Sequence, residues 1–156
     1  MDNIQSEPFY ALKWFMDPHG PYSPPAKYLE KLDVDWERLP RKQEFYTTAW
    51  AADLGKLLRT GELNRAELDA VRALYQAEVE WMDERVGRIL SRLEQSGAME
   101  RTIIVFTADH GEMLGKHNKI GHGKEFWETL VNVPLIFHGP GIPRGKRVKA
   151  VVSHLS

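Results

Sequence analysis

Residues 102–107 read TIIVFT, an uninterrupted apolar run that is rich in β-branched side chains. A strand that is apolar on both faces is typical of a parallel sheet buried between layers. A long helical pattern precedes this run, and a polar, glycine-containing segment follows it directly. We therefore predict that residues 103–107 form a central strand, and that the chemistry of the protein lies just beyond its carboxyl end.

The segment before this strand has the pattern of one long amphipathic helix over residues 64–96. Asn64 can act as the N-cap, because Glu67 follows three residues later as in a capping box. Gly97 is placed to end the helix. Apolar residues then recur at spacings of three and four, at Leu68, Val71, Tyr75, Val79, Met82, Val86, Ile89 and Leu93. Such a stripe must pack against another part of the protein.

Two further apolar runs complete a strand-helix-strand pattern. Residues 8–16 read PFYALKWFM and stop at DPHGP, which cannot continue a strand. We predict that residues 9–15 and 103–107 lie in one sheet, with the 64–96 helix on its face. VPLIF at 133–137 is a third candidate strand, and residues 41 to about 58 are helix-prone. The predicted fold class is α/β.

Composition narrows the classes of partner. The chain has 156 residues, 42% of them hydrophobic and 28% charged, as in one globular domain. Its formal net charge of −1 gives no electrostatic reason to expect nucleic acid. No apolar run is long enough for a membrane span, and MDNIQSEPFY lacks the features of a signal peptide, so the localisation stays open. The absence of cysteine excludes a thiolate metal site or cysteine nucleophile within this chain.

The segment after the central strand, TADHGEMLGKHNKIGHGK at 107–124, is crowded with histidine and lysine. Asp109 and His110 leave the strand end together, and a carboxylate beside an imidazole suits a divalent cation. The alternative is that Asp109 caps a following helix that continues through Gly111 and Glu112. A zinc site of the H-E-x-x-H type is not expected, because that spacing is absent.

Three more residues have both a structural and a functional interpretation. His122 and Lys124 either belong to a solvated basic loop or point back at an anion beside the metal. His19, next to prolines, is either a turn residue or part of the same site. The sequence pattern alone leaves these alternatives open.

The order of the motifs adds further information. DPHGPYSPP, the long helix, TADHGEMLGKH, GHGKEFWE and VPLIFHGPGIP together closely resemble the sulfatase family of the alkaline phosphatase superfamily. The resemblance covers nearly all of residues 8–156. It implies an alkaline phosphatase-like three-layer α/β/α domain with a mostly parallel central sheet. Residues 1–156 would be the middle and later part of its catalytic domain.

The resemblance also implies roles for individual residues. Asp109 and His110 match a pair of metal ligands, although many relatives have Asn in place of His110; calcium is the expected ion, with magnesium or manganese as alternatives. His19 and Lys124 match groups that bind the sulfate and assist catalysis, and His122 matches a residue of the substrate site. His117 matches a frequent histidine of less settled role. The implied substrate of the complete enzyme is a sulfate-ester small molecule or glycan.

One departure from the family pattern is large. The family's nucleophile lies in a C/S-x-P-x-R motif, where Cys or Ser becomes formylglycine, and SPPAK at 23–27 does not match it. Ser156 also stands where relatives usually have Asp. We therefore expect a chain truncated at both ends, inactive alone, that associates through exposed sheet edges. Two alternatives remain: a phosphoester or phosphonate hydrolase of the same superfamily, and a non-catalytic metal-binding remnant.

Overall fold

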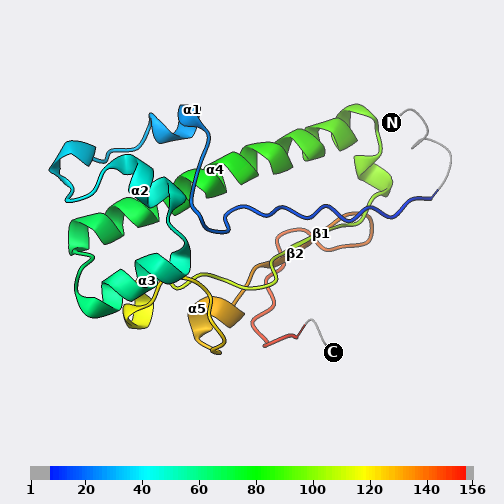
Figure 1. Cartoon of the computed structure of the whole chain (residues 1–156). Helices are drawn as coiled ribbons and strands as arrows, with labels where there is room; N and C mark the ends of the chain where they lie inside the picture. The colour runs from blue at the N-terminus through cyan, green and yellow to red at the C-terminus, as the bar shows by residue number, and fades with distance from the viewer. Residues whose placement is uncertain (1–7, 154–156) are drawn as a thin grey trace.

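The computed structural model describes residues 8–153. Its elements are the helices α1 (Ala26–Leu29), α2 (Gln43–Thr48), α3 (Ala51–Thr60), α4 (Arg65–Gln95) and α5 (Glu128–Val131), the strands β1 (Ile104–Thr107) and β2 (Leu135–His138), and the short 3-10 helices η1 (Trp36–Arg38), η2 (Met99–Arg101) and η3 (Lys116–Asn118). Helix α4 runs along most of the molecule, with α1, α2 and α3 gathered around its first half (Figure 1).

Helix α4 confirms the predicted helix and its caps. The amide of Glu67 donates to Asn64 Oδ1 at 3.0 Å, and Glu67 Oε2 accepts from the amide of Asn64 at 2.8 Å. These reciprocal bonds satisfy two amides that the first turn would otherwise leave unpaired. The helix ends at Gln95 with Ser96 as its C-cap, and Gly97 follows in the left-handed region with φ +69°.

The packing of α4 differs from the prediction. Its buried residues all lie in the first half of the helix: Glu67, Leu68, Ala70, Val71, Leu74, Ala77 and Glu78. In the second half Met82, Val86 and Leu93 are only partly buried, and Ile89 is 41% exposed. Helix α2 packs against the first half, and α1 lies farther along, where Lys27 and Tyr28 contact Glu84. The sheet predicted to carry this helix is absent from the described residues, so that prediction is wrong for them.

The hydrophobic core lies among the helices. It consists of Tyr22, Tyr46, Leu54, Leu63, Leu68, Val71, Leu74 and Ile120, contributed by α2, α3, α4 and the loops around them. Ile120 comes from the histidine-rich segment after β1, which is therefore anchored to the helical core. This anchor fixes the position of part of the candidate site relative to α3 and α4.

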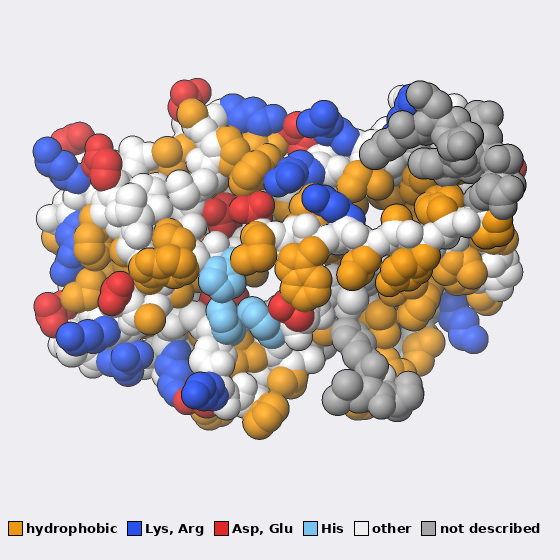
Figure 2. Space-filling model, turned by 45° about the vertical axis from the view of Figure 1, so that its right-hand side comes forward, with side chains coloured by type: hydrophobic (Ala, Val, Ile, Leu, Met, Phe, Trp, Pro, Cys, Tyr) orange, Lys and Arg blue, Asp and Glu red, His pale blue; other side chains and the backbone are white. Residues whose placement is uncertain are grey.

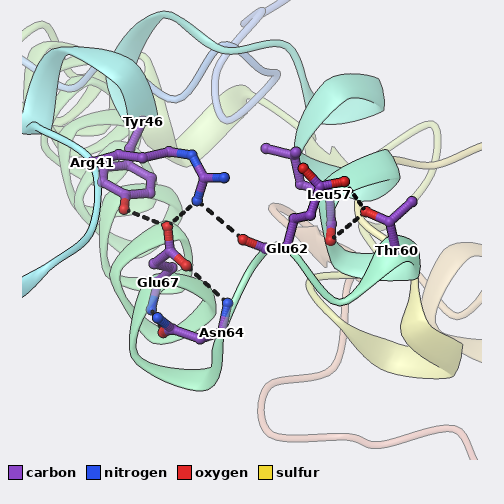
Figure 3. Close-up of polar contacts among 7 residues, drawn as sticks. All are labelled: Arg41, Tyr46, Leu57, Thr60, Glu62, Asn64 and Glu67. Carbon is purple, nitrogen blue, oxygen red and sulfur yellow. Dashed lines mark hydrogen bonds and ion pairs between the residues drawn. The ribbon is translucent and has the colours of Figure 1, made fainter.

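A buried carboxylate joins α4 to the elements that precede it (Figure 3). Glu67 is 1% exposed, forms an ion pair with Arg41, and accepts a hydrogen bond of 2.8 Å from the Tyr46 hydroxyl. Arg41 also donates to the carbonyl oxygen of Glu62 at 3.1 Å. Burial is the main cause that raises the pKa of Tyr46 to about 12, and the hydrogen bond to the Glu67 carboxylate is the second cause.

The described residues contain one two-stranded antiparallel sheet, formed by β1 and β2. In its register Ile104 pairs with His138 and Thr107 pairs with Leu135. Strand β2 confirms the third predicted strand, displaced toward its carboxyl end. The chain thus combines helices with a small sheet, while the mostly parallel central sheet and the three layers stay predictions for a complete domain.

The prediction of a strand at residues 9–15 is wrong for the described residues, because this segment belongs to no sheet within residues 8–153. It runs extended beside the second half of α4 (Figure 1), where Arg85 lies 5.3 Å from the ring of Phe15. Its apolar side chains are open to solvent, with Tyr10 88% and Leu12 74% exposed. An apolar run favours a strand, but a strand also needs a hydrogen-bonding partner, and the described residues supply none here.

Large hydrophobic side chains remain exposed on this part of the molecule. They include Phe9, Trp14 and Met16 of the extended segment and Val105, Ile136 and Phe137 of the two-stranded ribbon formed by β1 and β2. Figure 2 shows hydrophobic side chains gathered over much of one face. Exposed apolar surface of this extent is typical of an interaction site. Among the described helices, none is both long and apolar enough to cross a membrane.

Candidate active site

The candidate site is built on the loop that follows β1. Gly111 lies where this loop passes α5, and its amide donates to the carbonyl oxygen of Leu130 at 2.8 Å. A Cβ at position 111 would lie 2.0 Å from the carbonyl oxygen of Thr129, so only glycine fits without movement of the backbone. This close approach directs Asp109 and His110 to the surface next to α5.

The rest of the loop folds back on itself and is held at its buried residues. The amide of Gly115 donates to the carbonyl oxygen of Lys119 at 2.7 Å, and Met113 is 2% exposed. Ile120 lies against α3, where a Cβ added at Gly55 would come within 3.0 Å of its carbonyl oxygen. Residues 111–113 are not helical, so the alternative in which Asp109 caps a continuing helix is wrong.

Three histidines from two distant segments come together at this loop. The rings of His110 and His122 are stacked with centroids 4.1 Å apart, and His19 lies 5.2 Å from His122. His19 is contributed by the turn that precedes α1, next to Trp50 at a centroid distance of 6.5 Å. Figure 2 shows histidine side chains gathered at one place on the surface. The structure thus groups three of the predicted site residues.

Asp109 and His110 lie next to each other at the edge of this cluster. Asp109 Oδ1 accepts from the amide of His110 at 2.9 Å, and Oδ2 lies 3.7 Å from His110 Nε2. A cation at a bond length of about 2.0–2.5 Å from each atom can bridge this separation, so the pair fits two positions of a divalent metal site. No group of three or more metal-binding side chains occurs among residues 8–153.

Lys124 lies beside the cluster. It lines a hollow of about 560 Å³ together with His19, Trp50 and His122. Lys124 and His122 also line a second, larger hollow that includes Asp109 and His110. The two hollows therefore meet at His122 and Lys124. A small anion placed there would lie near a lysine and imidazoles, which are hydrogen-bond donors when protonated, and also near the carboxylates of Glu112 and Glu125.

His117 is separated from this group. Its ring stacks on Trp127 at a centroid distance of 3.7 Å and an interplanar angle of 17°. Its backbone is in the left-handed region with φ 50°. The neighbouring Trp127 donates from Nε1 to Glu125 at 3.2 Å, and Glu125 pairs with Lys119. His117 therefore braces the outer part of the loop.

Sequence reasoning missed the buried polar residues beneath the histidines. The Glu112 side chain is 7% exposed and lies 3.8 Å from His122 Nδ1, measured to its Oε2. Tyr22 is fully buried, and burial together with the Glu112 charge raises the pKa of its hydroxyl. Glu78, 2% exposed, accepts from the amide of Ser23 at 2.6 Å, and burial raises its pKa to about 7. The only sequence signal that pointed to Glu112 as a site residue was its position directly after the D-H-G motif.

The chain is similar in sequence to known proteins over most of its length. The Sulfatase family model matches residues 1–156. The arylsulfatase of Clostridium perfringens is 29% identical over 147 residues, which are 92% of this chain and 30% of that protein. Human arylsulfatase K is 28% identical over 165 residues, covering 95% of this chain and 30% of that protein.

The chain is also similar to a solved structure. The phosphonate monoester hydrolase of Silicibacter pomeroyi matches with a TM-score of 0.57 and 28% identity, over 82% of this chain and 28% of that one. This likeness supports an alkaline phosphatase-like α/β fold. The chain spans about 30% of the length of the curated relatives it matches. The sulfatase family acts on sulfate esters and is generally metal-dependent. Because the family model matches the whole sequence, the chain belongs to the sulfatase family.

Proposed function

We propose that this chain forms the later part of a sulfate-ester hydrolase domain and supplies half of its active site. The observation that carries this proposal is the grouping of His19, His110 and His122 beside Asp109. These residues come from separate segments, yet they share one surface site. A loop that was merely solvated would have no reason to gather them.

Within this proposal the residues have distinct roles. Asp109 and His110 hold a divalent metal, for which calcium is the expected ion and magnesium or manganese the alternatives. Lys124, His122 and His19 bind the sulfuryl group and neutralise the charge that develops on its oxygens and on the leaving group. A metal ion, when bound, supplies further charge stabilisation at the same anion.

The nucleophile is the part that this chain does not contain. The sequence has no cysteine, and its serines do not lie in a C/S-x-P-x-R motif. We propose that a formylglycine carried by polypeptide outside residues 1–156 attacks the sulfur. The exposed apolar side chains of Val105, Ile136 and Phe137 support this proposal, because a sheet with both faces uncovered suits the docking of further strands and helices.

The experiment compares the chain alone with a longer polypeptide. Reading the coding DNA upstream of Met1 shows whether an in-frame C/S-x-P-x-R segment is present. We expect the longer product, made together with the formylglycine-generating machinery, to hydrolyse 4-nitrophenyl sulfate. We expect the 156-residue chain alone to give no turnover above the metal-only blank. Turnover by the chain alone that Asp109→Ala abolishes would contradict the proposal, as would the absence of the motif.

Point variants in the active, longer polypeptide assign the roles. We expect Asp109→Asn and Lys124→Met to lower kcat/KM by about 100-fold or more, since the first weakens the binding of the metal and the second removes a positive charge beside the reacting anion. Lys116→Met is the matched control, because Lys116 is an exposed lysine of the same loop on η3. Equal effects of the two lysine variants would contradict the role of Lys124.

Phosphonate monoester hydrolysis is the second candidate function. It is favoured by the structural likeness to a protein named as a phosphonate monoester hydrolase. Both reactions place a small tetrahedral anion at the same group of cations, so the site geometry supports either one. The ratio of kcat/KM for 4-nitrophenyl sulfate and for a 4-nitrophenyl phosphonate monoester decides between them.

A further inference from the structure

Three buried polar side-chain atoms have no hydrogen-bond partner among the described residues. They are the hydroxyl oxygen of Tyr22, Nδ1 of His122 and Oε2 of Glu78. A buried polar atom without a partner costs free energy, and such atoms nearly always have one in native proteins. The Tyr22 hydroxyl and a protonated Nδ1 of His122 are donors, so each needs an acceptor close by.

Glu112 is placed to be that acceptor. Its side chain is 7% exposed, and Oε2 lies 3.8 Å from His122 Nδ1. The same carboxylate is close enough to the Tyr22 hydroxyl to raise the pKa of that group, after the larger effect of burial. Its other oxygen, Oε1, accepts from the amide of Met113 at 2.8 Å. That bond leaves Oε2 available to both side chains.

We propose that Glu112 is a positioning residue that accepts hydrogen bonds from His122 Nδ1–H and from the Tyr22 hydroxyl. A shift of about 1 Å closes the gap at His122 to an ordinary N–H···O distance. The bond fixes the ring plane and the tautomer of His122. The neutral ring then carries its lone pair on Nε2, at the edge away from the buried Nδ1.

The two neighbouring histidines have the same arrangement. His19 Nδ1 lies 2.8 Å from the carbonyl oxygen of Gly20, and His110 Nδ1 lies 2.8 Å from that of Gly111. With Glu112 as its partner, His122 becomes the third ring that turns Nδ1 toward the protein. All three then keep Nε2 for a ligand, as histidines at metal and anion sites commonly do.

The meaning of this arrangement for catalysis rests on the proposed function. With its Nδ1–H bonded to Glu112, His122 can take up a proton at Nε2 and then donate from that atom to the sulfuryl oxygens, as the proposed function requires, whereas the opposite tautomer would turn its lone pair toward the Glu112 carboxylate. The hydrogen bond to Glu112 thus decides which tautomer of His122 faces the substrate. The tautomer itself can be measured without any enzymatic activity.

The test is long-range ¹H–¹⁵N NMR of the 156-residue chain labelled at histidine, at about pH 8.5, where free histidine is neutral. His122→Gln identifies the signals of His122. We expect the Nδ1–H pattern in the wild-type chain, its retention in Glu112→Gln, which keeps an acceptor oxygen, and its loss in Glu112→Leu. Glu125→Leu is the matched control, because Glu125 pairs with Lys119 in the same loop.

An Nε2–H pattern for His122 in the wild-type chain would overturn the proposal, and this result needs no Glu112 variant to fold. An unchanged Nδ1–H pattern in Glu112→Leu would overturn it as well. Failure of the longer polypeptide to hydrolyse sulfate esters would contradict the proposed function, but it would leave the tautomer of His122 as measured. The two failures are therefore distinguishable.

Discussion

Tyr46 donates a hydrogen bond of 2.8 Å to Glu67, a carboxylate that is 1% exposed in the first turn of α4. The same carboxylate pairs with Arg41 and closes the capping box with Asn64. One side chain therefore connects three parts of the helical half of the protein. A buried charge of this kind is costly when any of its partners is lost.

Replacement of Glu67 tests this connection. We expect Glu67→Ala to lower the free energy of unfolding by about 3–5 kcal/mol, because Arg41 loses its buried partner and the helix loses a cap. Urea unfolding followed by circular dichroism measures the change. Asp69→Ala, which removes a half-exposed partner of Arg65 and Arg72 on the same helix, is the control and should cost at most about 1 kcal/mol. Equal losses in the two variants would refute the special role of Glu67.

Glu78 gives a prediction about pH. Burial, partly offset by the hydrogen bond from the Ser23 amide and reinforced by the charge of Asp17, raises its pKa from 4.5 to about 7. Between these values the folded protein binds more protons than the unfolded chain, so this group lowers the free energy of unfolding as pH rises. Relative to wild type, Glu78→Gln should therefore gain up to about 3 kcal/mol between about pH 4 and pH 8.

Urea unfolding of both proteins at several pH values measures this difference. The difference should grow through the window between the two pKa values and become constant above it. A difference that does not depend on pH would show that Glu78 ionises in the folded protein much as it does in the unfolded chain.

The glycine after the Asp109–His110 pair is expected to be irreplaceable. Gly111→Ala places a Cβ 2.0 Å from the carbonyl oxygen of Thr129, so the loop or α5 must move. We expect a loss of about 1–3 kcal/mol and a changed NMR signal for His110. Gly87→Ala is the opposite control, because nothing lies within 4 Å of its Cβ in α4. Alanine there should stabilise the protein by about 0.5–1 kcal/mol. Similar effects at both positions would contradict this account.

Metal binding by the chain alone should be weak. Asp109 and His110 provide two ligands, whereas calcium takes about 6–8, so water must supply the remainder. Calorimetric titration with calcium, magnesium or manganese should give a dissociation constant in the range of about 1 mM or weaker, and Asp109→Ala should remove the heat signal. Micromolar binding that survives Asp109→Ala would place the metal at another site.

The sequence predicted local elements better than their partners. The caps and spacing of α4 are local, so Asn64, Glu67 and Gly97 identified the helix correctly. The apolar run at residues 9–15 carried the same local signal as a strand, but a strand also needs a hydrogen-bonding partner, and this prediction was wrong for the described residues. No local pattern showed that the second half of α4 would be only partly buried.

The candidate site was also predicted only in part. The motif order brought His19, Asp109, His110, His122 and Lys124 to attention, and the structure places them around two adjoining hollows. Their catalytic roles stay predictions. Glu112 and Tyr22 were missed, because an acidic or aromatic residue near a motif does not reveal whether its side chain is buried beneath the site. Burial of that kind follows from tertiary packing.

The anchoring of the histidine-rich loop has a consequence for local stability. Ile120, two residues before His122, belongs to the core shared with α3 and α4, whereas Asp109 and His110 follow directly from a two-stranded ribbon with exposed apolar faces. Amide hydrogens of the first half of α4 should therefore exchange slowly, and those of β1 and β2 quickly. Each fluctuation that separates the ribbon displaces the Asp109–His110 pair relative to His122. A polypeptide that docks on the ribbon would slow this motion, and so would set how long the two sides of the site stay in register.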